Sequence, residues 1–174
     1  MDMTSSINTP ASDMKHIICY LDFVSPYACL AFELLPEALS GLSYSLDYRP
    51  VLLGAMFKHH GQLGPAEVAP KRDRTYRQVA WLAHSRGIAL QKPARHPFSP
   101  LPLLRLALAC SPAAEPASPN RFVCETIFRH IWRGGAEALE PARLQALADM
   151  LMPSREVNGE AVKAQLKHNT DEAI

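Results

Sequence analysis

The stretch HIICYLDFVSPYACLAFE, residues 16–33, decides the fold of this 174-residue chain. It opens with an apolar run over residues 16–23, whose length and composition are typical of a buried strand. Apolar residues at helical spacing follow from Tyr27 onward. Ser25 is a residue type that caps helices, and Pro26 has the fixed φ of a first helical position, where its missing N–H is no loss. The stretch therefore predicts a strand, a tight turn and a helix with a hydroxyl at its tip.

A second strand is expected over residues 42–51, where apolar residues partly alternate with polar ones. The helix before it should cover residues 27–39, with Pro36 late in it and Gly41 beyond its end. Two strands joined through a helix form a βαβ unit, in which the strands pair in parallel with a right-handed crossover. The rest of the chain has the pattern of helices and loops, with helices expected at 71–86, 103–110, 121–133, 141–152 and 158–169.

The tip of the first helix has two interpretations. Free backbone N–H groups and the positive end of the helix dipole meet there, so the tip is suited to bind an anion. Ser25 can instead act only as the N-cap of its own helix. Spacing alone does not separate these two roles.

The chain resembles the 2-hydroxychromene-2-carboxylate isomerases, which are kappa-class glutathione-transferase-like members of the DsbA family. The resemblance implies a thioredoxin-like α/β fold with a large all-helical insertion after the second strand. It rests on short motifs that keep the family's order from about residue 16 to the end of the chain: DFVSPY at 22–27, YRPVLLGA at 48–55, FK at 57–58, GQ at 61–62, APKR at 69–72, Tyr76, GI at 87–88, HPF at 96–98 and IW at 131–132.

The resemblance also implies a division of the chain. We expect a disordered leader over residues 1–15, the first half of a thioredoxin-like domain over residues 16–51, and a helical insertion domain over residues 52–174. Thioredoxin-like domains finish with two further strands and a helix, and a cis-proline stands at the turn into those strands. Neither a strand-like run nor a Val-Pro pair follows Thr170. We therefore expect that this chain lacks the C-terminal part of the fold.

In the family, the serine at the helix tip receives the sulfur of glutathione. The resemblance thus assigns Ser25 as the catalytic residue, and Ser25, Pro26 and Tyr27 as the turn that binds glutathione. Ser25 and Ala28 stand where a thiol–disulfide oxidoreductase has the two cysteines of its CxxC motif. This turn therefore cannot cycle a disulfide, but it can stabilise the thiolate of a bound thiol.

The interactions available at the predicted turn are large enough to keep a bound thiol ionised at neutral pH. A free thiol with a pKa of about 8.5 is only slightly ionised at neutral pH. A helix N-terminus contributes about 0.3–1 kcal/mol, and up to about 2 kcal/mol when partly buried. A hydrogen bond from the Ser25 hydroxyl to a charged sulfur adds about 1.5–3 kcal/mol. Since one pKa unit corresponds to 1.36 kcal/mol, the two effects lower the thiol pKa by about one to three units.

The reaction implied by the resemblance is the isomerisation of a small aromatic carboxylate. The glutathione thiolate adds to a conjugated double bond, which rotates as a single bond and reforms when the thiolate leaves. Lys58 is the expected cation for the carboxylate, and Gly61 and Gln62, which match a Gly-Asn pair of the family, are the other expected substrate contacts. Three alternatives stay open: a kappa-type glutathione transferase or peroxidase, a DsbA-like thiol oxidoreductase, and a non-catalytic remnant.

Composition argues against several other classes of protein. A net charge of +1 gives no electrostatic reason to expect nucleic acid or an anionic membrane as a partner. No apolar run approaches the roughly 20 residues of a membrane span. No metal site is expected, because His59 and His60 are adjacent and do not share a helical face. The chain is expected to work in the cytoplasm, and it could form a homodimer.

The cysteines are expected to be reduced, since their spacing fits neither a CxxC motif nor a zinc site. They are Cys19, Cys29, Cys110 and Cys124, of which the first two are expected to be buried.

Several other residues are expected to be structural. Arg72 and Arg74 should form a solvated face, Trp81 and Trp132 should belong to the core, and His96 should support its proline-rich loop. On the helix at 71–86, helical spacing predicts one buried face, formed by Tyr76, Val79, Ala80 and Ala83.

Overall fold

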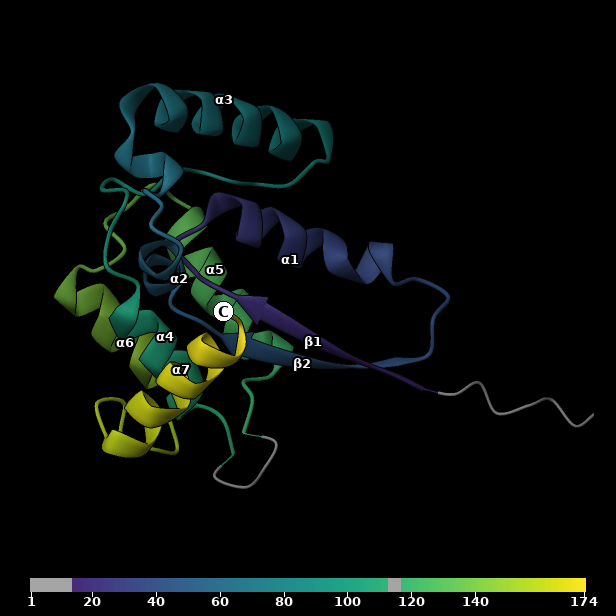
Figure 1. Cartoon of the computed structure of the whole chain (residues 1–174), viewed down its shortest axis with the longest axis vertical. Helices are drawn as coiled ribbons and strands as arrows, with labels where there is room; N and C mark the ends of the chain where they lie inside the picture. The colour runs from purple at the N-terminus through teal and green to yellow at the C-terminus, as the bar shows by residue number, and fades with distance from the viewer. Residues whose placement is uncertain (1–13, 113–116) are drawn as a thin grey trace, which may run out of the picture.

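The computed structural model describes residues 14–112 and 117–174, in which one small sheet packs against helices (Figure 1). The strands β1 (Lys15–Leu21) and β2 (Tyr44–Pro50) pair in parallel, with Ile17 opposite Leu46. The predicted βαβ unit is therefore confirmed. The leader expected at residues 1–15 lies outside the described residues, except for Met14 and Lys15, and Lys15 already belongs to β1.

The helix between the strands, α1 (Pro26–Ala38), begins where the sequence predicts. Ser25 is its N-cap and Pro26 its first residue. Pro36 is accommodated within the last turn, and the chain then turns back at Gly41, whose φ of +82° favours glycine. These local signals place the end of β1 directly before the tip of α1.

The helices α3 to α7 agree with the predicted ranges to within a few residues at each end. The helix α2, which follows β2 directly, and a short 3-10 turn, η1, which precedes α3, were not predicted. Their bounds are α2 (Leu53–His59), η1 (Pro65–Glu67), α3 (Ala69–Ser85), α4 (Leu101–Ala109), α5 (Arg121–Trp132), α6 (Pro141–Leu151) and α7 (Glu160–Glu172).

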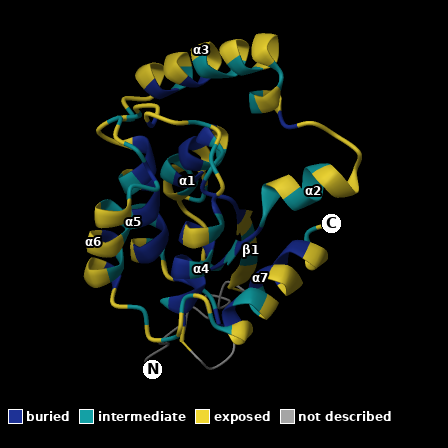
Figure 2. Cartoon of the chain, turned by 90° about the vertical axis from the view of Figure 1, so that its left-hand side faces the viewer, coloured by how far each residue is buried: buried dark blue, intermediate teal, exposed yellow. Residues whose placement is uncertain are grey.

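The core lies between the sheet and the helices α4 and α5, whose inner faces are buried (Figure 2). Phe128 on α5 meets Phe23 at a ring distance of 4.9 Å and Phe32 of α1 at 5.1 Å. The Trp132 indole is buried, as predicted, and its Nε1–H donates to the Phe23 carbonyl at 3.1 Å. The strand, the first helix and the later helices thus share one core, which holds the residues just before Ser25 in place.

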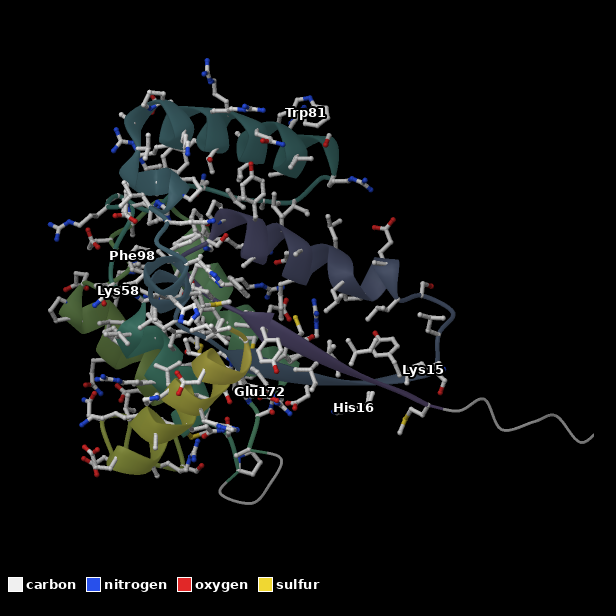
Figure 3. All side chains as sticks on the ribbon, in the orientation of Figure 1. Lys15, His16, Lys58, Trp81, Phe98 and Glu172 are labelled. Carbon is white, nitrogen blue, oxygen red and sulfur yellow. The ribbon has the colours of Figure 1, made fainter. Side chains whose placement is uncertain are left out.

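Helix α3 lies outside this core, above α1 in Figure 1. Its buried residues are Val79 and Ala83. The prediction for Trp81 is wrong, because its side chain is 66% exposed and points away from the protein (Figure 3). Ala80, expected on the buried face, is also exposed. Two residues turn a helix by about 200°, so Trp81 lies opposite Val79, and α3 has a neighbour on one side only.

All four cysteines are free thiols. Burial raises the pKa of Cys29 to about 12, with a smaller contribution from Glu33, and burial also raises the pKa of Cys124. Cys19 is half-buried, which corrects the expectation of full burial. Among the described residues, none of the helices combines the length and apolar character that crossing a membrane requires.

Candidate functional site

A cavity of about 710 Å³ opens at the N-terminal tip of α1. Much of its wall is apolar, with Leu53, Phe57 and Phe98 among the lining side chains. The wall comes from segments far apart in the sequence: residues 24–27, residues 52–54 with Phe57, residues 64–67, one side of α3 at Arg72, Thr75 and Tyr76, and residues 96–100. Its size and composition are those of a site for a small organic molecule.

Ser25 stands at the tip of α1 and lines this cavity. Its Oγ accepts a hydrogen bond from the Ala28 N–H at 3.3 Å, as expected of an N-cap. This bond uses a lone pair, so the hydroxyl proton can still be donated to a ligand. The Tyr27 N–H has no hydrogen-bond partner among residues 14–112 and 117–174. The capping role and a ligand-binding role are therefore compatible.

The side chain of Tyr27 connects α1 with α3. Its hydroxyl donates to Gln78 Oε1 at 2.9 Å, and the ring lines the cavity. Pro26 lines the cavity as well, and its side chain is buried at the helix tip. Ser25, Pro26 and Tyr27 thus lie together in one wall of the cavity.

A buried carboxylate supports the turn from behind. Asp22, 4% exposed, accepts hydrogen bonds from the Val24 N–H at 2.6 Å and the Leu53 N–H at 3.3 Å. Burial raises the pKa of Asp22 to about 6, against the opposing effect of hydrogen bonds from the backbone of Val24, Leu53 and Ser25. Asp22 therefore connects the end of β1 to the start of α2. The sequence shows this aspartate directly after a strand, but its partner at Leu53 is known only from the fold.

His96 joins the opposite wall to the same turn. Its Nε2 lies 2.7 Å from the Val24 carbonyl oxygen, and its Nδ1 lies 2.6 Å from the Tyr76 hydroxyl. The His96-Pro97 peptide bond is cis. Burial lowers the pKa of His96, and the neighbouring Lys92 lowers it further. His96 was predicted to support its proline-rich loop. Its position also makes it accessible to a ligand, because both His96 and Tyr76 line the cavity.

The three predicted substrate residues do not line the cavity. Lys58 is exposed at the end of α2, one turn beyond Gly54, and Figure 3 labels it. Gly61 and Gln62 are exposed in the loop that follows. Lys58, Gly61 and Gln62 thus lie next to cavity residues in the sequence, since Phe57 and Gly64 line the cavity, but they are not part of its wall.

Arg72 is a charged residue of the cavity wall that sequence reasoning placed on a solvated face. Its side chain is 40% exposed, and its Nε lies 3.9 Å from Asp73 Oδ1. No signal within the APKR motif distinguishes Arg72 from its basic neighbours, since the distinction depends on which side of α3 faces the cavity.

The chemistry available at the site follows from these side chains. All four cysteines are among the described residues, and none of them lines the cavity. Within residues 14–112 and 117–174 no group of three or more His, Cys, Asp and Glu side chains is placed to hold a metal ion. The cavity offers the Ser25 hydroxyl and an amide donor at a helix tip, the hydrogen-bonded Tyr76–His96 pair, the charged residues Arg72 and Glu67, and the hydroxyl-bearing Thr75 and Ser99.

Comparison with known proteins agrees with the fold. Among solved structures, this chain is similar to 2-hydroxychromene-2-carboxylate isomerase, with a TM-score of 0.72 and 18% sequence identity over 91% of this chain and 78% of that chain. Among curated proteins, no sequence is significantly similar. The model of the DSBA-like thioredoxin domain family matches residues 16–174. The chain therefore belongs to the family of DsbA-like thioredoxin domains.

Proposed function

We propose that this protein is a glutathione-dependent isomerase of a small aromatic carboxylate of the 2-hydroxychromene-2-carboxylate type. The observation that carries the proposal is the position of Ser25, whose hydroxyl stands at the tip of α1 in the wall of a largely apolar cavity. The similarity to a solved isomerase of this name supports the choice of reaction. Free cysteines and a thiol cofactor fit a reduced, cytoplasmic compartment.

The donors at the tip of α1 fit a thiolate. The Ser25 hydroxyl proton and the Tyr27 N–H are both available, and the dipole of α1 favours a negative charge at this end. When bound, glutathione would supply a thiolate that adds reversibly to a conjugated double bond and so allows the bond to rotate. The protein's own task is to keep that sulfur ionised at neutral pH.

The remaining walls fit an aromatic acid. Leu53, Phe57 and Phe98 offer apolar surface to a ring, and this surface limits the access of water. We assign the carboxylate of the substrate to Arg72, because Arg72 lines the cavity and carries a guanidinium, whereas the exposed Lys58 is not among the lining residues. A cation at this place also stabilises negative charge that develops on the substrate during the reaction.

Replacing Ser25 tests the proposal. In Ser25→Ala the bound thiol loses a charge-assisted hydrogen bond worth about 1.5–3 kcal/mol, so its pKa rises by about one to two units. The rate of glutathione-dependent isomerisation at neutral pH should fall at least tenfold and recover partly as the pH is raised. Ser25→Cys should form a mixed disulfide with glutathione, detectable by mass spectrometry.

Ser85→Ala is the matched control, because Ser85 is exposed at the end of α3, where its hydroxyl donates to the Leu82 carbonyl. It should leave the pH–rate profile unchanged. If Ser25 acts only as an N-cap, Ser25→Ala should instead lower the free energy of unfolding by about 0.5–2 kcal/mol and leave the profile as it was. That result would refute the thiolate role. Conjugation of glutathione to a chloronitrobenzene without isomerisation would indicate a transferase.

A further inference from the structure

We propose that Tyr76 and His96 form a proton-accepting pair, which binds a hydroxyl group of the ligand in the cavity and takes up its proton. The pair connects α3 to the residue before Ser25 through two short hydrogen bonds, and both side chains line the cavity. The binding of a hydroxyl follows from this geometry alone. Only the identity of the substrate rests on the proposed function.

The partners of His96 determine where its proton lies. The Val24 carbonyl oxygen can only accept, so the proton of the neutral imidazole must be on Nε2, which donates across 2.7 Å. Nδ1 then carries a lone pair and accepts from the Tyr76 hydroxyl at 2.6 Å. Because the Tyr76 proton is already used, its oxygen presents lone pairs to the cavity. This oxygen can therefore accept a hydrogen bond from a ligand hydroxyl but has no proton to donate to it.

The surroundings keep the pair in this state. The rings of Trp132 and Phe98 pack against His96 at 5.3 and 5.9 Å. Burial and the charge of Lys92 lower the pKa of His96, so the imidazole is neutral at neutral pH. Burial raises the pKa of Tyr76, which keeps the phenol protonated.

Charged residues lie near the pair, and Glu67 is a further charged residue of the cavity wall. Lys92 Nζ lies 4.6 Å from the centre of the Tyr76 ring, and Arg72 and Asp73 on α3 act on the Tyr76 hydroxyl with opposite sign. Lys92 also disfavours a positive charge on His96.

The pair suits a substrate whose hydroxyl is on the ring carbon that bears the carboxylate. A double bond within a six-membered ring cannot turn from cis to trans until the ring opens. The hydroxyl proton passes to Tyr76 while the Tyr76 proton passes to His96 Nδ1. The hydroxyl oxygen then forms a C=O bond, and the ring C–O bond breaks with its electron pair remaining on the phenolate oxygen. The pair returns the proton to this phenolate, so no oxidant or other reactant is required.

Binding of 4-methylphenol and 4-methylanisole tests the hydroxyl site in the complete chain without glutathione. The two probes differ in the hydroxyl proton, which only the phenol can donate. Calorimetry at pH 7.5 should show that the wild type binds the phenol about tenfold more tightly, as expected of one hydrogen bond. Tyr76→Phe should lose this preference while keeping the hydrogen bond of His96 to Val24. Tyr44→Phe and His84→Asn, which lie outside the cavity wall, are the matched controls and should keep it.

A pH series separates this role from a purely structural connection between α3 and the turn. Protonated His96 donates from Nδ1 to the Tyr76 oxygen, so Tyr76 must turn its own proton toward the cavity. The preference for the phenol should therefore disappear as the pH falls through the lowered pKa of His96. In His96→Gln, which can still donate to Val24, no such pH dependence should remain. Equal binding of the two probes by the wild type, no binding of the phenol, or an unchanged preference in Tyr76→Phe would overturn the proposal.

The substrate itself distinguishes this proposal from the proposed function. Opening of the ring of 2-hydroxychromene-2-carboxylate, followed without glutathione, should slow about 100-fold in Tyr76→Phe and should be unaffected in the control Ser85→Ala, which lies outside the cavity wall. Isomerisation with glutathione should require both Tyr76 and Ser25. If isomerisation is absent but the probes are discriminated, the proposed function fails and the hydroxyl site stands. If isomerisation depends on Ser25 but not on Tyr76, the proposed function stands and the proton-accepting role of the pair is refuted.

Discussion

The two sides of the cavity are built differently. One side rests on α4 and α5, whose inner faces are buried and include Phe128 and Trp132. The other side is formed by α2 and α3. Helix α2, which lies wholly within the described residues, has no buried residue, and α3 has Val79 and Ala83. Figure 2 shows this contrast in the colours of α3 and α5. A fixed wall thus holds Ser25, and a more loosely packed wall closes the cavity.

Hydrogen bonds and apolar contacts both connect the two sides. Among the described residues, the hydrogen bonds include those of the Asp22 carboxylate with the Leu53 N–H, the Tyr27 hydroxyl with Gln78, and the Tyr76 hydroxyl with His96. Leu30 of α1 also packs in a small apolar cluster with Val79 and Ala83 of α3. The closed cavity therefore depends on individual hydrogen bonds together with this one small buried contact.

The largest effect is expected in the fixed wall. Phe128→Ala removes a side chain that is 1% exposed and packs against Phe23 and Phe32. It should lower the free energy of unfolding by about 3–5 kcal/mol, measured by urea denaturation. Trp81→Ala, at an exposed position of α3, should change it by less than about 0.5 kcal/mol. Comparable losses in the two variants would contradict the distinction between the walls.

An intermediate effect is expected at Asp22, which joins the fixed wall to α2. Its pKa rises from 3.8 in the unfolded chain to about 6 in the fold, so the native state binds a proton more tightly. The stability contributed by Asp22 is present below about pH 4 and decreases by about 3 kcal/mol as the pH rises through 6. Asp22→Asn should lose this pH dependence in urea denaturation between pH 4 and 7, whereas the exposed Asp73→Asn should retain it. If the free energy of unfolding changed equally with pH in the wild type and in Asp22→Asn, the prediction would be refuted.

The smallest effect is expected at the contact between α1 and α3. Tyr27→Phe removes the hydrogen bond to Gln78, which lies at the surface, and should lower the free energy of unfolding by at most about 1 kcal/mol. Amide hydrogen exchange should become faster in α3 and stay unchanged in α4 and α5. Faster exchange in α5 as well would mean that the two walls open together, and it would contradict the distinction between a fixed and a loosely packed wall. Tyr44→Phe serves as the control and should alter neither region.

Much of the fold could be predicted because its signals are local. A buried strand, an N-cap and a proline at the first helical position lie within a dozen residues, so the turn from β1 to α1 is specified by its own sequence. The bounds of α3 to α7 were likewise predictable from periodicity, since glycines and prolines interrupt the apolar pattern near their ends. The parallel βαβ unit and the position of Ser25 at a helix tip therefore follow from local sequence alone.

Which other side chains share that site depends on how the helices pack. His96 lies 72 residues from Val24 along the chain, and no periodic pattern relates the two. Periodicity identifies a buried face but not the neighbour that covers it, and for this reason Trp81 was misplaced and Arg72 was overlooked. The roles of Tyr76 and His96 depend on two hydrogen bonds between segments that meet only when the helices pack around the strand. Such contacts are long-range in sequence, and therefore only the packed fold brings these groups to Ser25.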